Sequence, residues 1–333
     1  MFSAMKSERI ISITCLTGVM VFMATTLFQP KMALAQWKPK RPVEFVIMAG
    51  QGGGADRLAR LIQSIIQKNK FSSQPLLPIN KGGGSGAEAL RYLKDKKGDP
   101  HVIMATLNSY YTTPLQNSSL GVDIKNFTPI ARLAIDTFLI WVNEDSGIKD
   151  LNGYIAAVKK ADGKWKMGGT GTGQEDSLVT GMLEKEFGVK YTYIPFKGGG
   201  TVAKNLVGQH VDSTVNNPAE AIGFLQAGKV RPIASFTPER QKVFGDVPTM
   251  KELGHDMSYF MQRSVVGPPG MPKEAVAYYV DMFKKVDQSK EWVEYTDKKS
   301  MYRDFLTGSA LQDFFLSERE AHHKLLKAMG EIK

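Results

Sequence analysis

Four glycine-rich segments are the part of this sequence best suited to binding chemistry. They cover residues 50–54, 81–86, 168–173 and 197–200, and each follows a short apolar run and opens a helical pattern. Glycine lets the backbone approach a ligand closely and adopt positive φ. The free N–H groups of the first helical turn and the positive end of the helix dipole favour an anion there. One such loop is better explained as a tight turn, but four at equivalent positions predict a site that holds an anion through backbone amides.

The same loops also fit a nucleotide-binding interpretation, which other features of the sequence disfavour. Residues 50–55 and 82–87 match the loose dinucleotide fingerprint. However, the second predicted strand ends in Pro78-Ile79-Asn80, without an acid that could hold a ribose hydroxyl. No Gly-Lys pair is followed by Ser or Thr, as a phosphate-binding P-loop requires. We therefore expect no nucleotide and no other cofactor.

Motifs for catalysis or metal binding do not occur in the sequence. The histidines, at positions 101, 210, 255, 322 and 323, have no recognised zinc spacing. There is no Gly-x-Ser-x-Gly nucleophile elbow. The single cysteine, Cys15, lies in an apolar N-terminal run, so a processed chain would contain no thiol. We expect no catalytic residue, no metal and no enzymatic activity; the alternative is a secreted hydrolase or lyase that uses Glu175 or Asp176 as a base.

The elements that position the loops alternate in two series. In the first, strands are predicted at 42–49, 76–80 and 101–106, with helices at 56–68 and 87–96. The second begins with an apolar run at 137–142, and its predicted strands are at 166–168, 191–194, 211–215, 231–236 and 260–266. Its predicted helices are at 151–160, capped by Asp150, and at 177–187, 201–207 and 219–226. The remainder to residue 333 reads as helical.

This order predicts an α/β fold in which parallel sheets are covered by helices on both faces. All four glycine-rich loops would then lie at the carboxyl ends of strands, the edge at which open α/β sheets bind ligands. Two loops come from each series, which predicts a cleft between two lobes. Periodicity alone does not decide whether the lobes are sequential or whether the chain leaves the first near Ala134 and re-enters it near Arg263.

The N-terminus has the order of a secretory signal peptide. Lys6 and Arg9 precede an uncharged apolar stretch at 10–28, and Ala33-Leu34-Ala35 supplies the small-residue cleavage pattern. A transmembrane anchor is the alternative. We expect cleavage after Ala35 and a periplasmic protein that starts at Gln36. The formal charge of +10 would raise the local concentration of anions; the alternative is a surface whose charges serve only solvation. The basic residues are scattered, so nucleic acid is not an expected partner.

The order and spacing of several segments resemble the substrate-binding proteins of tripartite tricarboxylate transporters, the Bug family of periplasmic receptors. The resemblance rests on AGQGGGADRLAR (49–60), INKGGGSGAEAL (79–90), VDIKNFTPIARL (122–133), GGTGTGQEDSL (168–178), IPFKGGGTVAKNLVGQHVDSTV (194–215), FGDVPTMKELG (244–254) and VGPPGMP (266–272). Two departures stand out. Gly82 replaces the usual proline of the second loop, and Glu175-Asp176 stand near a usual His-Leu. We expect Asp176 or Ser177 to cap a helix; the alternative is that Glu175 faces a ligand amine or hydroxyl.

The resemblance implies a two-lobed periplasmic binding protein, or Venus flytrap, in which each lobe is a mostly parallel sheet flanked by helices. After the signal peptide expected at 1–35, it favours a discontinuous first lobe at 36–135 plus 262–333 and a second lobe at 136–261. It implies a receptor that captures a small mono- or dicarboxylate and delivers it to the integral membrane subunits of a tripartite transporter. We expect a monomer. The alternative is a sensor subunit that presents its ligand to a membrane kinase.

The predicted ligand contacts combine the glycine-rich loops with one asparagine pair at a strand end. Ser85, Thr170 and Thr172 would donate hydroxyl hydrogen bonds, and the amide of Asn217 would reach the distal end of a ligand. Whether Lys197 adds charge or is a solvated loop lysine stays open. The predicted ligand-binding residues are Gly50, Gln51, Gly52, Gly53, Gly84, Ser85, Thr170, Gly171, Thr172, Lys197, Gly198, Asn216 and Asn217.

Overall fold

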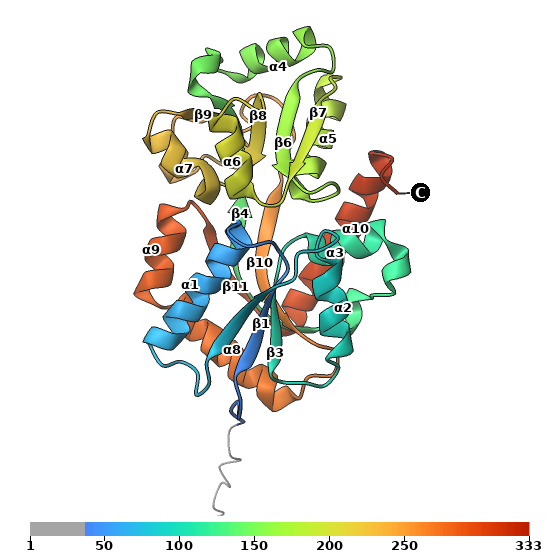
Figure 1. Cartoon of the computed structure of the whole chain (residues 1–333), viewed down its shortest axis with the longest axis vertical. Coiled ribbons are helices and arrows are strands. Elements are labelled where there is room, and N and C mark those ends of the chain that lie inside the picture. The colour runs from blue at the N-terminus through green and yellow to red at the C-terminus, as the bar shows by residue number, and fades with distance from the viewer. Residues whose placement is uncertain (1–36, 333) are drawn as a thin grey trace, which may run out of the picture. The chain divides into compact units, whose positions relative to one another are not determined.

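The computed structural model describes residues 37–332, whose strands and helices form two lobes, each built on its own sheet (Figure 1). The predicted signal peptide and its cleavage site at Ala35 lie outside the described residues. Among the helices of the described part, none is long and apolar enough to cross a membrane.

The first lobe contains the six-stranded sheet. Its strands are β1 (Val43–Ile47), β2 (Leu76–Asn80), β3 (Val102–Thr106), β4 (Thr128–Thr137), β10 (Phe260–Gly267) and β11 (Tyr302–Leu306), in the order β11-β4-β10-β3-β1-β2. Its helices are α1 (Gly54–Lys68), α2 (Ala87–Asp95), α3 (Ser109–Gln116), α8 (Lys273–Asp287), α9 (Lys290–Lys298) and α10 (Gly308–Ala328), with short 3-10 turns at Ser118–Leu120 and Ile124–Asn126.

Both faces of the sheet are covered at β1, which explains why this strand is apolar except for Glu44. Phe45 belongs to the core cluster that contains residues of α1 and α8, and its ring lies 6.5 Å from that of Phe283. Val46, the next residue, belongs to the cluster on the other face, with Leu90 and Leu93 of α2. Successive side chains of a strand point to opposite faces, so a strand covered on both sides has no polar alternation.

The second lobe contains the five-stranded sheet. Its strands are β5 (Leu139–Asn143), β6 (Lys166–Thr170), β7 (Thr192–Phe196), β8 (Ser213–Asn216) and β9 (Val230–Ser235), in the order β7-β6-β8-β5-β9. Its helices are α4 (Leu151–Lys160), α5 (Glu175–Phe187), α6 (Gly199–Val207) and α7 (Pro218–Gln226), with 3-10 turns at Glu144–Ser146 and Lys242–Phe244. The predicted cap of α4 is confirmed, because Asp150 Oδ1 accepts a hydrogen bond from Gly153 N at 2.8 Å.

Each sheet joins a parallel part to an antiparallel part. β1 runs parallel to β2 and β3, and β6 runs parallel to β7 and β8. β10 is antiparallel to β3 and β4, and β5 is antiparallel to β8 and β9. The two-lobed α/β architecture is confirmed, and the sheets are mixed: the parallel strands are those that carry the glycine-rich loops.

Two long strands connect the lobes. β4 ends at Thr137 beside Phe260, the first residue of β10, and β5 begins two residues later in the other sheet. The strands of the first sheet therefore fall at 43–137 and 260–306, and those of the second at 139–235. The predicted domain limits near 135 and 261 stay a prediction, because membership of a sheet does not show which segments fold as independent units.

Two strands were not expected from the sequence: β4, of which only Thr137 falls in a predicted apolar run, and β11. The region after residue 270 was predicted to be helical, but β11 pairs antiparallel with β4 at the edge of the first sheet, so that prediction was wrong for Tyr302–Leu306. Most of β11 is exposed or half-buried, and its side chains carry no apolar alternation. Its extended conformation depends on pairing with β4, which is distant in sequence.

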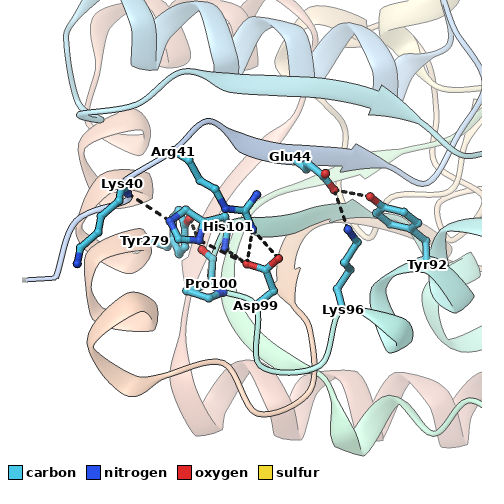
Figure 2. A network of polar contacts seen from close by, with 9 residues as sticks. All are labelled: Lys40, Arg41, Glu44, Tyr92, Lys96, Asp99, Pro100, His101 and Tyr279. Carbon is cyan, nitrogen blue, oxygen red and sulfur yellow. Dashed lines mark hydrogen bonds and ion pairs between the residues drawn. The ribbon is translucent and has the colours of Figure 1, made fainter.

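The described chain enters the first lobe at the edge opposite the glycine-rich loops. Figure 2 shows the contacts that fix this segment: Lys40 N donates to His101 Nε2 at 3.2 Å, and Arg41 pairs with Asp99 at 2.8 Å. Tyr279 OH donates to the Pro100 carbonyl at 2.6 Å. These contacts lie at the amino ends of β1 and β3, so they tie down the start of the fold without taking part in the ligand edge.

Candidate functional site

A cavity of about 440 Å³ lies between the glycine-rich loops of the two lobes. This volume falls in the range of roughly 300–1,000 Å³ that is usual for small-molecule sites. Its walls come from the loops after β1 and β2 on one side and after β6, β7 and β8 on the other. The lining residues are Ala49, Gly50, Gly53, Gly54, Ala55, Asn80, Gly82, Gly83, Ser85, Leu107, Thr170, Gly171, Gln174, Glu175, Asp176, Phe196, Lys197, Gly198, Gly199, Asn217, Glu220, Met261 and Arg263.

The first loop is held by a buried aspartate at the start of α1. Asp56 Oδ2 accepts a hydrogen bond from Gly52 N at 2.9 Å, and Oδ1 accepts from Arg60 Nε and Asn80 Nδ2, each at 2.9 Å. Burial acts to raise the pKa of Asp56, but these hydrogen bonds and the charge of Arg60 outweigh it, so the pKa lies below its usual value. The loop is therefore fixed by an acid whose charge is balanced within the first lobe.

The second loop is also held by an acid from the helix that follows it, and it requires glycine at position 82. Glu88 Oε2 accepts from Gly83 N at 3.3 Å, while Oε1 pairs with Lys81 at 3.1 Å. A Cβ at Gly82 would lie 2.7 Å from the backbone of Ala49 and Gly50. The backbones of the two loops therefore lie too close together at Gly82 for a side chain there.

The third loop is also pinned by an acid. Asp176, 3% exposed, accepts a hydrogen bond from Thr170 N at 2.7 Å, and Ser177 Oγ accepts from Gly173 N at 2.8 Å. The helix begins at Glu175 after Gln174, without a side-chain cap, so the expected capping by Asp176 or Ser177 was wrong. Because α5 starts earlier than predicted, both side chains lie inside its first turn and reach back to the loop.

Within residues 37–332, Asp176 has no compensating cation. Its burial raises the pKa well above the usual value, and the nearby negative charges of Glu220 and Glu175 act in the same direction. The hydrogen bond from Thr170 offsets only part of this effect. The pKa of Asp176 is therefore raised, whereas the pKa of Asp56 is lowered.

Glu175 crosses the cleft. This side chain is 2% exposed, and its Oε1 accepts a hydrogen bond from Ser109 N at 3.0 Å. Ser109 is the first residue of α3 in the first lobe, whereas Glu175 opens α5 in the second. Burial raises the pKa of Glu175, partly offset by the N–H groups that face it. The sequence left open whether Glu175 meets a ligand; the structure places it on the cavity wall and in a contact between lobes.

Glu220 lies where two helices from different lobes begin. A Cβ added to Gly199 would come 2.0 Å from Glu220 Oε2, and one added to Gly54 would come 3.2 Å from Oε1. The carboxylate therefore lies against the first residues of α6 and α1, whose N-terminal dipole ends favour negative charge. Asn216 Nδ2 donates to Oε2 at 3.0 Å. Burial nevertheless raises the pKa of Glu220.

The buried cation on the cavity wall is already paired. Arg263, 4% exposed, forms an ion pair with Asp136, which is 1% exposed. Its Nη2 also donates to Asn217 Oδ1 at 3.3 Å, and Asn217 Nδ2 donates to the Thr137 carbonyl at 2.7 Å. This group joins β4, β10 and the strand end before α7, so it stabilises the crossing between lobes.

The structure brings most of the predicted ligand-binding residues to one cavity. Those that line it are Gly50, Gly53, Ser85, Thr170, Gly171, Lys197, Gly198 and Asn217. Those that stand beside it without lining it are Gln51, Gly52, Gly84, Thr172 and Asn216. The amide of Asn217 already has partners on both polar atoms, and Ser85 Oγ donates across the cleft to the Thr172 carbonyl at 3.3 Å.

Apart from Lys197 and Asn217, the predicted set omitted the charged and amide groups of the wall, which are Asn80, Gln174, Glu175, Asp176, Glu220 and Arg263. Two signals in the sequence could have indicated some of them. Pro218 is typical of a first helical position, which puts Glu220 in a first turn at the ligand edge. Arg263 stands in an otherwise apolar strand, where a charge requires a buried partner. Among residues 37–332, no cluster of His, Cys, Asp and Glu has metal-binding geometry.

The fold and the cavity define a two-lobed solute-binding protein. Residues 58–330 match the family described as "Tripartite tricarboxylate transporter family receptor", and the chain belongs to this family. The family is one of receptors and not of enzymes.

Individual proteins agree with this assignment. A protein of Cupriavidus necator described as "UPF0065 protein in gbd 5'region" is 27% identical over 304 residues, covering 91% of this chain and 92% of the relative. The periplasmic binding protein BugD has the same fold, with a TM-score of 0.82 and 23% identity over 89% of this chain and 99% of BugD. MatC from Rhodopseudomonas palustris, solved with bound malate, has a TM-score of 0.77 and 24% identity over 86% of this chain and 99% of MatC.

Proposed function

We propose that this protein is a periplasmic receptor that captures a small organic acid, a mono- or dicarboxylate, and delivers it to the integral membrane subunits of a tripartite tricarboxylate-type transporter. The observation that carries the proposal is the cavity of about 440 Å³ between glycine-rich loops of both lobes. Membership of the receptor family supports the role, and the malate bound by MatC supports the ligand class.

Binding would use backbone groups more than charged side chains. The first N–H groups of a helix have no acceptor within the helix, and the helix dipole adds positive potential there. The starts of α1 and α6 border the cavity, as does the 81–86 loop that leads to α2. We propose that Gly50, Gly53, Ser85, Thr170, Gly171, Lys197, Gly198 and Asn217 contact the ligand, and that Gln51, Gly52, Gly84, Thr172 and Asn216 shape the loops that hold it.

The proposal includes the location and state of the protein. The signal peptide is cleaved after Ala35, and the mature chain works as a monomer without cofactor or nucleic acid. N-terminal sequencing of the exported protein tests the first point and should return Gln36 as the first residue. An exported chain that still begins at Met1 would contradict it. Sedimentation of the mature chain tests the monomer.

The decisive experiment is thermal unfolding of the mature protein against mono- and dicarboxylates, aromatic acids, amino acids and nucleotides. A ligand at about a hundred times its dissociation constant adds about 2.7 kcal/mol to the free energy of unfolding. A shift with a carboxylate that is recovered chemically unchanged supports capture. No shift with any acid would contradict the proposal. Uptake of that acid by cells with and without the receptor gene then tests delivery, since a sensor would leave uptake unchanged.

A further inference from the structure

We propose that the ligand of this cleft carries a positively charged group, such as a protonated amine, together with its carboxylate, and that Asp176 and Glu220 receive the positive end. The inference deepens the proposed function and rests on it. It names a ligand class for the same cavity, and three separate observations lead to it.

The first observation is the charge on the cavity wall. Glu175, Asp176 and Glu220 all line the cavity, and within the described chain none of them has an ion-pair partner within 4.0 Å. Two cations also line it. Arg263 is already paired with Asp136, and Lys197 is exposed. A site built only for anions would not gather carboxylates on its wall, because their repulsion would oppose binding.

The second observation concerns the partners of the buried Asp176 carboxylate. Its side chain is 3% exposed and lines the cavity, and Oδ2 accepts the hydrogen bond from Thr170 N. The Thr170 side chain also acts as a hydrogen-bond donor to this carboxylate, but no cation among residues 37–332 compensates its charge. A buried carboxylate is stable when it is paired and fully hydrogen-bonded. A cationic group of the ligand would supply the missing positive charge.

The third observation is the position of Glu220. Its carboxylate lies between the N-terminal ends of α1 and α6, the place where helix dipoles from both lobes converge. A position that would suit a ligand carboxylate is thus filled by the protein itself. The second loop remains available to the ligand carboxylate, because Lys81 balances the charge of Glu88 there. The ligand would then place its carboxylate toward Gly83 and Ser85 and its amine toward Asp176.

The experiment compares acids that differ only at one end. Isothermal titration at pH 7.5 measures binding of three matched pairs to the mature protein: succinate with 3-aminopropanoate, glutarate with 4-aminobutanoate, and adipate with 5-aminopentanoate. L-aspartate is added as an α-amino counterpart of succinate. We expect at least one amino acid to bind about tenfold or more tightly than its dicarboxylate partner.

Two variants assign the preference to residues. Asp176→Asn keeps an oxygen for Thr170 N but removes the charge, and should reduce the preference for the amino acid at least tenfold. Glu220→Gln should reduce it in the same direction and serves as the second test if Asp176→Asn does not fold. The matched control is Asp212→Asn, since Asp212 also accepts a backbone hydrogen bond in the second lobe, from Lys166 N at 2.7 Å, but does not line the cavity. It should leave the preference unchanged.

The outcomes separate this inference from the proposed function. Dicarboxylates that bind more tightly than every amino acid, or a preference that survives in both variants, would overturn the inference and leave the receptor intact. Binding of none of the acids would overturn the proposed function and the inference with it. An amine preference that is lost in Asp176→Asn and kept in Asp212→Asn would support both.

Discussion

The two lobes hold their glycine-rich loops in the same way but balance the charge differently. In each lobe an acid near the start of the following helix accepts a hydrogen bond from a loop N–H: Asp56 and Glu88 in the first, Asp176 in the second. The acids of the first lobe are paired with Arg60 and Lys81. Asp176 is not paired with any described residue. The hydrogen bond that fixes a loop therefore does not require that the acid also has an ion-pair partner. Among the described residues, only the second lobe places acids without such a partner on the cavity wall.

The largest expected effect comes from removing the one buried cation of the wall. Arg263→Met leaves Asp136 buried without its partner, and breaking such a pair costs about 3–5 kcal/mol. Urea unfolding should show a loss of this size. The control is Arg231→Met, because Arg231 pairs with Glu144 at the surface, where such pairs contribute about 0–1 kcal/mol. Similar losses in both variants would contradict the buried role of Arg263.

Removing the unbalanced charge of the second lobe should stabilise the protein. The pKa of Asp176 is raised in the folded state, so its protonated form is favoured by folding. The corresponding stability is present below the unfolded pKa, near 3.8, and is lost as the pH rises through the folded pKa. We expect Asp176→Asn to gain about 1–3 kcal/mol at pH 8 and little at pH 3.5. Thermal unfolding across this range measures it; a loss at pH 8 would show that the charge stabilises the fold.

The same substitution in the first lobe should have the opposite sign. The pKa of Asp56 is lowered on folding, so its stabilisation is present above the unfolded pKa of about 3.8 and is lost as the pH falls through the folded pKa. Asp56→Asn should therefore cost about 1 kcal/mol at pH 7, and the difference should shrink in acid. Parallel pH titrations of both variants compare the lobes directly. If both substitutions changed the free energy of unfolding at pH 7 in the same direction, the proposed difference between the lobes would be wrong.

The smallest effect is expected for the partner of Glu88. The Lys81–Glu88 pair is partly exposed, with side-chain exposures of 22% and 50%, so Lys81→Met should change stability by about 0.5 kcal/mol or less. Its effect on binding should be more visible, because Glu88 would then repel a ligand carboxylate near Gly83. Calorimetry with a bound acid should show weaker binding, and unchanged affinity would place the carboxylate elsewhere in the cavity.

The sequence predicts the order of strands and helices well because the relevant signals are local. β2 was predicted at the residues where it lies, and the apolar runs and glycine-rich breaks placed all four loops after parallel strands. β11 was missed because its conformation depends on a distant partner strand rather than on its own side chains.

The charge balance of the site could be predicted only in part. The pairing of Asp56 with Arg60 follows from their spacing of four residues on a helix. The contact of Glu175 with Ser109 spans 66 residues and exists only because two lobes meet. No local pattern reports whether a buried acid such as Asp176 has a partner, since that depends on residues brought together by the fold.

The hydrogen bond between Glu175 and Ser109 also affects the equilibrium between a shut form, in which the two lobes are in contact, and an open form, in which they are apart. Because its two ends belong to different lobes, it contributes to the shut form only, whether or not a ligand is present. A net contribution of about 1 kcal/mol changes the ratio of shut to open molecules about fivefold. The apparent dissociation constant scales inversely with the fraction that is competent to bind. This one contact therefore affects two quantities together: the affinity for the ligand, and the fraction of ligand-free molecules in which the two lobes are in contact.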